Sequence, residues 1–232
     1  MYKENPGLVV EVLQDFVRIM EKAKEGVKVV MASTSSLYNG HEPPHHEDLP
    51  VLVTDYYTEA RYWAERLAQV YRLLHDVEYV ALRLFSVYGP NERPKGRFAN
   101  VLSQMIWAGL EGRPFIIYGD GNQTRDFIYV EDVVDAFMKA MEKDVSGVFN
   151  VGTGKETSFN QLASKIKEVT GLDLQLEYRE NPIKNYVYRT GASTVRAERE
   201  LGFKAKTSLE EGISKVFPVY KEGRLELICK VV

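Results

Sequence analysis

The feature that most constrains the fold of this chain is a regular alternation of short β-branched runs with amphipathic segments of helical period. Buried strands are predicted at 27–33, 77–89, 114–119 and 147–152, and a half-buried strand at 173–180. Apolar spacing predicts helices at 8–24, 54–75, 97–111, 131–143, 158–170, 193–201 and 208–221. Because parallel strands need a crossover of helix length between them, this alternation predicts an α/β fold with a parallel sheet.

Composition and charge exclude several classes of protein. The chain has 232 residues, of which 44% are hydrophobic, so it can bury a sizeable core. Its 30 Lys and Arg against 33 Asp and Glu give a net charge of −3, without the basic surplus of a nucleic-acid binder. The single cysteine, Cys229, excludes an internal disulfide and a cysteine-based zinc site. No apolar run approaches the roughly 18 residues of a membrane span, and residues 1–20 lack a signal segment, so we expect a cytoplasmic protein.

A hydroxyl, a phenol and a cation could converge on one crevice. Tyr57 and Arg61 are four residues apart on a predicted helix and share a face. Thr34 ends a predicted buried strand, and ligands of open α/β sheets bind beyond such strand ends. A tyrosine has an ordinary pKa of about 10, and a neighbouring cation favours its charged form. From the spacing alone, a packed Tyr57 beside a solvated Arg61 is the commoner arrangement.

Five segments, in this order, resemble the extended short-chain dehydrogenase/reductase family, and within it the NAD-dependent nucleotide-sugar epimerases and dehydratases of the UDP-glucose 4-epimerase type. They are MASTSSLYNG (31–40), YTEARYWAE (57–65), LRLFSVYGP (82–90), IYGDGNQTRDFIYVEDV (117–133) and FNVGTG (149–154). The resemblance implies the C-terminal part of a Rossmann-like parallel sheet with a smaller α/β substrate-binding subdomain. We expect the Rossmann-like portion at 1–95 and the sugar-nucleotide subdomain mainly at 96–232, interleaved with the sheet near 114–155.

The same resemblance implies three catalytic residues. Tyr57 and Arg61 match the family's Tyr-x-x-x-Lys, with Arg in place of Lys, and Thr34 matches its catalytic Ser/Thr, four residues before Tyr38. In the family the tyrosine is the acid/base on the sugar hydroxyl and the cation binds the nicotinamide ribose of NAD; Leu84 is a further cofactor contact. In the implied reaction, Tyr57 takes the proton of the sugar 4-hydroxyl and NAD takes the hydride from C4. The resulting 4-keto sugar then turns in the site, and the hydride returns to its other face.

The two residues after Thr34 help to choose the reaction. The resembling dehydratases carry an Asp-Glu pair there, whereas this chain has Ser35 and Ser36, which cannot serve as that acid/base pair. The resemblance therefore favours C4 epimerisation of a UDP-hexose over dehydration. Two alternatives stay open: a catalytically incomplete fragment that binds sugar nucleotides, and an epimerase or reductase of other specificity.

A UDP-sugar site is also implied by the resemblance, made of Ser86, Asn100, Tyr118, Arg125, Asn185 and Arg189. Arg125 and Asn100 match diphosphate ligands of the family, and Tyr118 matches a residue beside the nucleobase. Ser86 occupies a position that is often Asn. Arg125 could instead form an ion pair with Asp126 or Glu131.

Two other motifs give weaker functional signals. His41, His45 and His46 stand in a loop at 39–50 without the spacing of a metal site, so we expect no bound metal. The stretch Gly152-Thr-Gly154-Lys155 lacks the first glycine and the Ser/Thr of a phosphate-binding loop.

The chain contains no strand–turn–helix with the G-x-G-x-x-G pattern that holds the NAD pyrophosphate in the family. We therefore expect three strands of the nucleotide-binding sheet, weak or absent NAD binding by this chain alone, and no detectable epimerase activity without a separate cofactor-binding half. The strand at 27–33 would be an exposed edge, capped by another chain, by strand swapping, or by the tail 225–232, which has high β-propensity.

A homodimer through helices 8–24 and 54–75 is a further expectation from the resemblance. Phe16, Met20, Trp63 and Leu67 form an apolar stripe suited to a four-helix interface. Packing of the same stripe against the sheet explains the pattern equally well.

Overall fold

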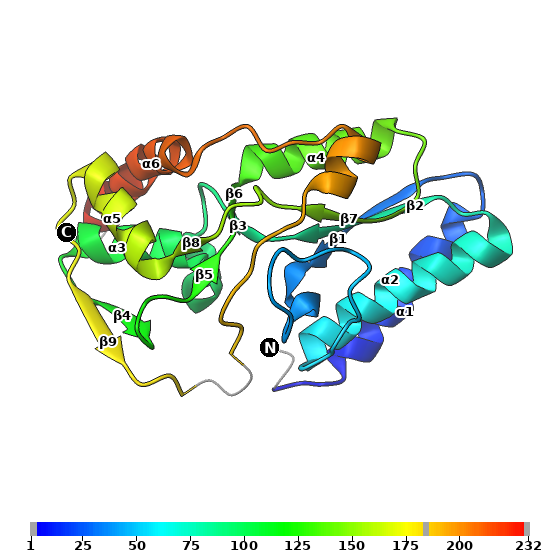
Figure 1. The fold of residues 1–232 in the computed structure, drawn as a ribbon, viewed down its shortest axis with the longest axis horizontal. Coiled ribbons are helices and arrows are strands. Elements are labelled where there is room, and N and C mark those ends of the chain that lie inside the picture. Colours follow the sequence, from blue (N-terminus) through cyan, green and yellow to red (C-terminus); the bar gives the residue numbers. More distant parts are fainter. Residues whose placement is uncertain (1–3, 183–185, 230–232) are drawn as a thin grey trace.

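The computed structural model describes residues 4–182 and 186–229 and shows two groups of elements side by side (Figure 1). One group, the sheet lobe, surrounds a three-stranded sheet. The other, the helical lobe, is built on three helices and short strand pairs. The α/β class and the parallel pairing predicted from the sequence are both confirmed.

The sheet lobe is centred on three parallel strands in the order β1-β2-β7. Their bounds are β1 Val29–Thr34, β2 Tyr79–Leu84 and β7 Gly147–Val151. Thr34 is paired with Leu84, and Leu84 with Val151, so the three strands end at one common edge. Within the described residues β1 has a strand neighbour on one side only, which makes it the expected edge strand.

Helices cover both faces of this sheet because successive side chains of β2 point to opposite sides. Tyr79 and Ala81 pack with α1 (Leu8–Ala23) and α2 (Tyr56–His75), whereas Val80 and Leu82 pack with α4 (Val130–Glu142) and the π-helix η3 (Ala197–Leu201). Figure 1 shows α1 and α2 together on one face and α4 on the other.

The helical lobe has its own core. Its helices are α3 (Val101–Glu111), α5 (Phe159–Thr170) and α6 (Leu209–Cys229), and they share one buried apolar cluster. Short strands complete it: β4 (Phe115–Tyr118) pairs in parallel with β9 (Leu176–Arg179), and β5 (Thr124–Arg125) pairs antiparallel with β8 (Thr157–Ser158).

The single strand expected at 77–89 is wrong, because the chain changes sheets within it. β2 stops at Leu84, and the Phe85 N–H donates to Val151 of β7 at 3.0 Å. The next N–H, of Ser86, donates to Asp126 at 2.9 Å and begins β3 (Ser86–Tyr88). β3 pairs with β6 (Phe127–Tyr129). One continuous apolar run therefore serves two sheets.

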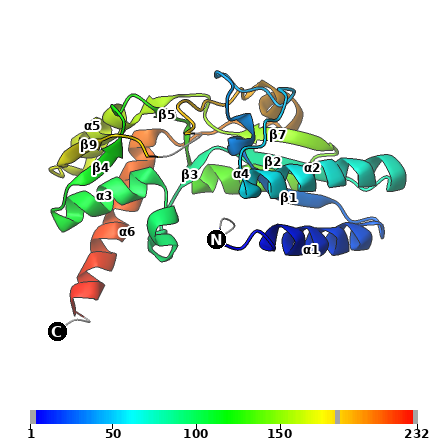
Figure 2. The same cartoon turned by 90° about the horizontal axis from the view of Figure 1, so that it is seen from below.

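The tail differs from its sequence-based expectation. The backbone at 225–229 continues α6 instead of forming a strand, and residues 230–232 lie outside the described part. Because α6 ends away from β1, the described tail does not cap the edge of the sheet (Figure 2). Among the described residues no helix is long and apolar enough to cross a bilayer.

The apolar stripe of α1 and α2 divides between two environments. Met20 is fully buried, and Phe16 and Leu67 pack against the same intramolecular cluster, so these three follow the alternative of packing on the sheet. Trp63 remains 41% exposed.

Candidate active site

Thr34 lies at the carboxyl edge of the sheet, where β1 gives way to the 3-10 helix η1 (Ser35–Tyr38). Its hydroxyl accepts the N–H of Ser36 at 3.2 Å and caps this helix. The side chain is 7% exposed, and its register partner on β2 is Leu84. The strand end therefore presents a hydroxyl and an apolar side chain next to each other.

Tyr57 and Arg61 lie on the first two turns of α2, beside that edge. Asp55 accepts the N–H of Thr58 at 2.9 Å and fixes where the helix begins. The Arg61 guanidinium lies 5.4 Å from the centre of the Tyr57 ring, and its Nη1 donates to the Ala32 carbonyl of β1 at 3.4 Å. The cation thus connects the phenol, which is 37% exposed, to the strand that carries Thr34.

The three residues predicted to be catalytic lie in one region of the molecule. α2 contacts both β1 and η1, and Figure 1 shows the start of α2 beside η1. The three residues are therefore close enough in the fold for the predicted catalytic role to be proposed for them.

Beneath this region is a buried ion pair that sequence reasoning missed. Glu65 of α2 receives Nε and Nη2 of Arg83 at 3.0 and 2.7 Å, and both side chains are 4% exposed. The Ser33 hydroxyl donates to the same carboxylate at 2.5 Å. Burial opposes the charge, but the bonds to Glu65 leave the pKa of Arg83 raised. The signal in the sequence was spacing, since Glu65 follows Tyr57 and Arg61 at intervals of four.

Tyr38 belongs to this buried network and is no candidate for acid/base work. Its hydroxyl receives Nη1 of Arg83 at 2.9 Å and donates to Asn150 Oδ1 at 2.7 Å. Burial raises the pKa of Tyr38 to about 12. Of the two motif tyrosines, Tyr57 is the accessible one.

Arg125 is held without a carboxylate. Its guanidinium donates to the carbonyls of Thr124, Val187 and Tyr188 and lies between the rings of Tyr186 and Phe159. Burial lowers its pKa from the usual value. The alternative ion pairs are absent among the described contacts. Asp126 bonds to backbone and hydroxyl groups, and Glu131 pairs with Lys215. A partly desolvated cation without a counter-charge is suited to an anionic ligand.

Asp126 explains why the Gly152–Gly154 turn is not a phosphate loop. The fully buried carboxylate accepts the N–H groups of Thr153 and Gly154 at 2.8 and 2.9 Å, and that of Ala192 at 3.1 Å. The donors that would cradle a phosphate are therefore already bound within the protein.

Ser86 and Asn100 are brought together by the fold. Nδ2 of Asn100 donates to the Ser86 hydroxyl at 3.0 Å and to the Val87 carbonyl at 2.9 Å, while its Oδ1 caps α3 at Leu102. Both amide hydrogens are thus used inside the protein. A diphosphate contact by Asn100 would require one of these bonds to be exchanged.

The remaining predicted sugar-nucleotide residues lie in the helical lobe and its loops. Tyr118 ends β4 and is 40% exposed. Arg189 forms ion pairs with Glu156 at 2.8 Å and Glu42 at 2.9 Å. Asn185 lies outside the described residues.

The histidines of the 39–50 loop are not arranged around a common point. His45 is buried, stacks on Tyr38 at 5.0 Å, and bonds through its two nitrogens to the His41 carbonyl and the Gly191 N–H. Within the part of the chain that the structure describes, no three His, Cys, Asp or Glu side chains are close enough to hold a metal ion.

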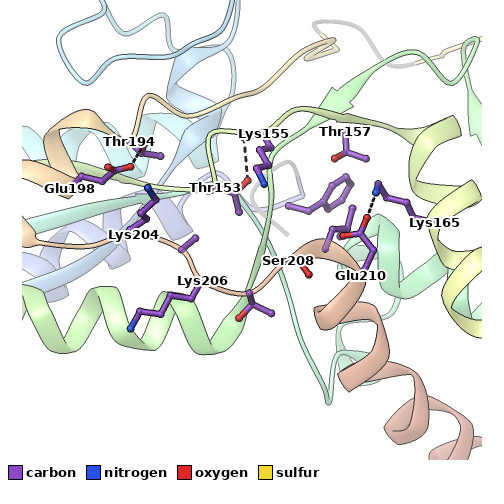
Figure 3. A pocket seen from close by; sticks show the side chains of 15 residues that line it. Thr153, Lys155, Thr157, Lys165, Thr194, Glu198, Lys204, Lys206, Ser208 and Glu210 are labelled. Carbon is purple, nitrogen blue, oxygen red and sulfur yellow. Dashed lines mark hydrogen bonds and ion pairs between the residues drawn. The ribbon is translucent and has the colours of Figure 1, made fainter.

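A cavity of about 320 Å³ lies elsewhere, where the end of β7 meets α5 and the start of α6 (Figure 3). Its lining includes none of the predicted site residues. Lys165 is paired with Glu210, and the Thr194 hydroxyl donates to Glu198 at 2.7 Å. Lys206 points away from the other labelled side chains (Figure 3). The carboxyl edge of the sheet, and not this cavity, is therefore the candidate active site.

The chain is similar in sequence to a known family and to individual proteins. The family model described as "NAD dependent epimerase/dehydratase family" matches residues 4–152. A putative UDP-glucose 4-epimerase of Methanocaldococcus jannaschii is 39% identical over 192 residues, covering 82% of this chain and 61% of that protein. The UDP-glucuronate 4-epimerase of Thermodesulfobacterium geofontis is 34% identical, covering 98% of this chain and 70% of that protein.

A solved structure is similar in fold and sequence. MoeE5 in complex with UDP-glucose and NAD superposes with a TM-score of 0.81 at 37% identity, covering 90% of this chain and 70% of that one. The chain thus spans about two thirds of the length of these proteins, and less than two thirds of the M. jannaschii relative.

Proposed function

This chain belongs to the NAD dependent epimerase/dehydratase family, and from that premise we propose that it takes part in epimerising C4 of a UDP-hexose of the UDP-glucose/UDP-galactose type through a 4-keto intermediate. The observation that carries the proposal is the phenol of Tyr57 under the guanidinium of Arg61, beside the strand end that bears Thr34. As part of this proposal, residues 1–95 form the remaining portion of the Rossmann-like nucleotide-binding domain. Residues 96–232 mainly form the sugar-nucleotide subdomain, interleaved with the sheet near 114–155.

Tyr57 moves the proton in the proposed reaction. Its ring is accessible and lies beside the Arg61 guanidinium, so its hydroxyl can exchange a proton with a bound sugar hydroxyl. Thr34 orients the sugar hydroxyl from the strand end. Arg61 places a guanidinium beside the phenol.

NAD supplies the hydride chemistry when it is bound, by accepting a hydride from the sugar carbon and returning it. The residues present fit its nicotinamide-ribose end. An accessible phenol and a planar guanidinium, which can bind a ribose diol, stand at the edge where ligands of such sheets bind. Leu84 is the apolar contact proposed for the same end.

Arg125 is the proposed diphosphate ligand, because among the described residues its partners are carbonyls and aromatic side chains and none of them is a carboxylate. Tyr118 is proposed beside the nucleobase. Ser86 and Asn100 are proposed on the diphosphate side, with Arg189 and Asn185 from the 184–189 segment.

The residues after Thr34 favour epimerisation over dehydration. Ser35 and Ser36 form the first turn of η1 and place hydroxyls, not carboxylates, next to the proposed hydroxyl-binding Thr34. Glu65, a buried carboxylate bonded to the neighbouring Ser33, is engaged by Arg83 as well. No acid/base pair for the removal of water is proposed.

A second candidate function is sugar-nucleotide binding without turnover by this chain. The absence of a G-x-G-x-x-G turn from the sequence, and the capture of the Gly152–Gly154 amides by Asp126, favour it. A separate cofactor-binding partner would then be needed for catalysis.

Calorimetric titration with UDP-glucose, UDP-galactose, UDP-glucuronate and NAD, each alone, tests both candidates. We expect UDP-sugar binding, weak or undetectable NAD binding, and no interconversion of sugars by NMR with NAD added. Interconversion would establish the chain as a complete epimerase and end the second candidate. No binding of any UDP-sugar at millimolar concentration would overturn both.

A homodimer through α1 and α2 is proposed separately. Ile19, Trp63, Leu73 and Leu74 expose between 41 and 75% of their surface on these helices. Sedimentation should show a dimer that Trp63→Glu converts to a monomer; a monomeric wild type would exclude the interface.

A further inference from the structure

A buried carboxylate, that of Glu65, attaches the helix that carries Tyr57 to the sheet. Resting on the proposed function, we propose that Glu65 is a positioning residue that sets where the Tyr57 phenol stands relative to Thr34. It does so by clamping α2 to the ends of β1 and β2.

The clamp joins three elements at one group. The Glu65 carboxylate accepts three hydrogen bonds, one from Ser33 of β1 and two from Arg83 of β2. Ser33 directly precedes Thr34, and Arg83 directly precedes Leu84. The two donors are therefore neighbours of the residues proposed to face sugar and cofactor.

Helix geometry transmits this attachment to the phenol. Tyr57, Arg61 and Glu65 follow at intervals of four and lie along one side of α2. Glu65 is two turns from Tyr57, a distance of about 12 Å at about 1.5 Å per residue. Arg61, between them, bonds to Ala32 of the same strand. Both contacts hold the same side of α2 against β1.

A second set of contacts holds the Arg83 guanidinium in place. Nη1 of Arg83 is shared by the Tyr38 hydroxyl at 2.9 Å and the Glu47 carbonyl at 3.2 Å. Tyr38 in turn bonds to Asn150 of β7. The guanidinium therefore cannot follow a displaced carboxylate without breaking contacts to η1 and to the 39–50 loop.

Stability alone does not require a charge here. Replacing a buried ion pair by well-packed apolar residues is often neutral or stabilising, whereas removing one partner is strongly destabilising. What an apolar pair lacks is direction, because dispersion contacts do not fix rotation or translation along a strand as three hydrogen bonds do. The two roles can therefore be separated by experiment.

The test uses the full chain with 3-fluorotyrosine incorporated at position 57 and its fluorine resonance as the readout. Glu65→Asp withdraws the carboxylate by one methylene and keeps its charge. The double variant Glu65→Leu with Arg83→Met removes the pair and keeps the volume. Asp132→Asn is the control: Asp132 is 6% exposed and accepts the N–H groups of Lys206 and Thr207, on the opposite face of the sheet.

We expect Glu65→Asp and the double variant to shift the resonance by more than its linewidth. The urea midpoint of Glu65→Asp should fall below that of wild type, whereas the midpoint of the double variant should lie closer to wild type. The fluorine resonance should stay shifted in both variants. Asp132→Asn should lower the midpoint and leave the resonance in place.

An unmoved resonance in the folded double variant would overturn the proposal, even where Glu65→Asp fails to fold. An equal shift in Asp132→Asn would overturn it as well. The readout needs no ligand, so failure of UDP-sugar binding refutes the proposed function and leaves this measurement decisive on its own.

Discussion

Arg83 in the sheet lobe and Arg125 in the helical lobe are both withdrawn from water, yet their charges are matched in different ways. Arg83 forms two bonds to Glu65 and a third to Tyr38, so its charge is neutralised inside the protein. Arg125 contacts three carbonyls and two rings, none of which carries a negative charge. The first arginine fixes structure, and the second is the one that we propose binds an anionic ligand.

Arg189 stands between these two cases. Its partners Glu42 and Glu156 are carboxylates, but the Glu42 side chain is 80% exposed and the Arg189 side chain 44%. Such pairs contribute little to stability and exchange readily with solvent or ligand. Arg83 thus has a buried pairing that fixes structure, whereas the pairing of Arg189 is exposed and can be replaced by an incoming anion.

The largest effect is expected for Arg83→Ala. It leaves the Glu65 carboxylate buried without its counter-charge, which costs about 3–5 kcal/mol of unfolding free energy. Urea denaturation measures this loss. Arg189→Ala is the matched control and should leave the midpoint almost unchanged. Equal losses in both variants would erase the distinction between the two regions.

The next effect is on affinity. Arg125→Gln should weaken UDP-sugar binding roughly 10- to 100-fold, as expected for about 1.5–3 kcal/mol of lost charge-assisted hydrogen bonds. Arg196→Gln removes the same charge from a surface pair with Asp48 and should leave affinity unchanged. Calorimetry with UDP-glucose compares the two. Wild-type affinity in Arg125→Gln would place the diphosphate elsewhere.

A smaller gain is expected when Arg189 loses a competitor. Glu42→Gln should strengthen UDP-sugar binding slightly, because one carboxylate no longer occupies the guanidinium. Asp48→Asn makes the same charge change in the same loop, on a residue that pairs with Arg196, and should have no effect. A gain that persists in the Glu42→Gln, Arg189→Gln double variant would contradict a role for Arg189.

The smallest effect concerns pH. Burial lowers the pKa of His45 below its ordinary value of 6.5, although the bonds to His41 and Gly191 act in the opposite direction. Below pH 6.5 the unfolded chain therefore binds a proton that the folded chain does not. His45 stabilises the fold fully above that pH, and its contribution declines as pH falls toward the lowered value.

Unfolding free energies at pH 7 and 5.5 test this sign. The loss on acidification should be smaller in His45→Gln than in wild type. His46→Gln, an exposed histidine in the same loop, should behave as wild type. A steeper loss in His45→Gln would reverse the assignment.

Much of the sheet lobe could be predicted from the sequence because its signals are local. The β-branched runs of β1 and β7, and the spacing of four in α2, are set by neighbours in the chain. The spacing alone allowed Tyr57, Arg61 and Thr34 to converge at a strand end, and the resemblance to the family made this the prediction.

What the sequence could not supply depends on pairings between distant segments. Arg83 and Glu65 are 18 residues apart in the chain, and charged residues of these types usually lie on the solvated surface. Here the packing of α2 on the sheet buries both. The switch at Phe85 depends on the carbonyls of Val151 and Asp126, which accept the consecutive N–H groups of Phe85 and Ser86. Asn100 is a recognisable cap, but its bond to Ser86 requires β3 to leave the first sheet.

That switch has a mechanical consequence. Phe85 and Ser86 are adjacent, yet one is hydrogen-bonded into the sheet lobe and the other into the strand pair leading to the helical lobe. Pulling the lobes apart along this line would break two consecutive backbone hydrogen bonds, so this junction resists separation of the lobes.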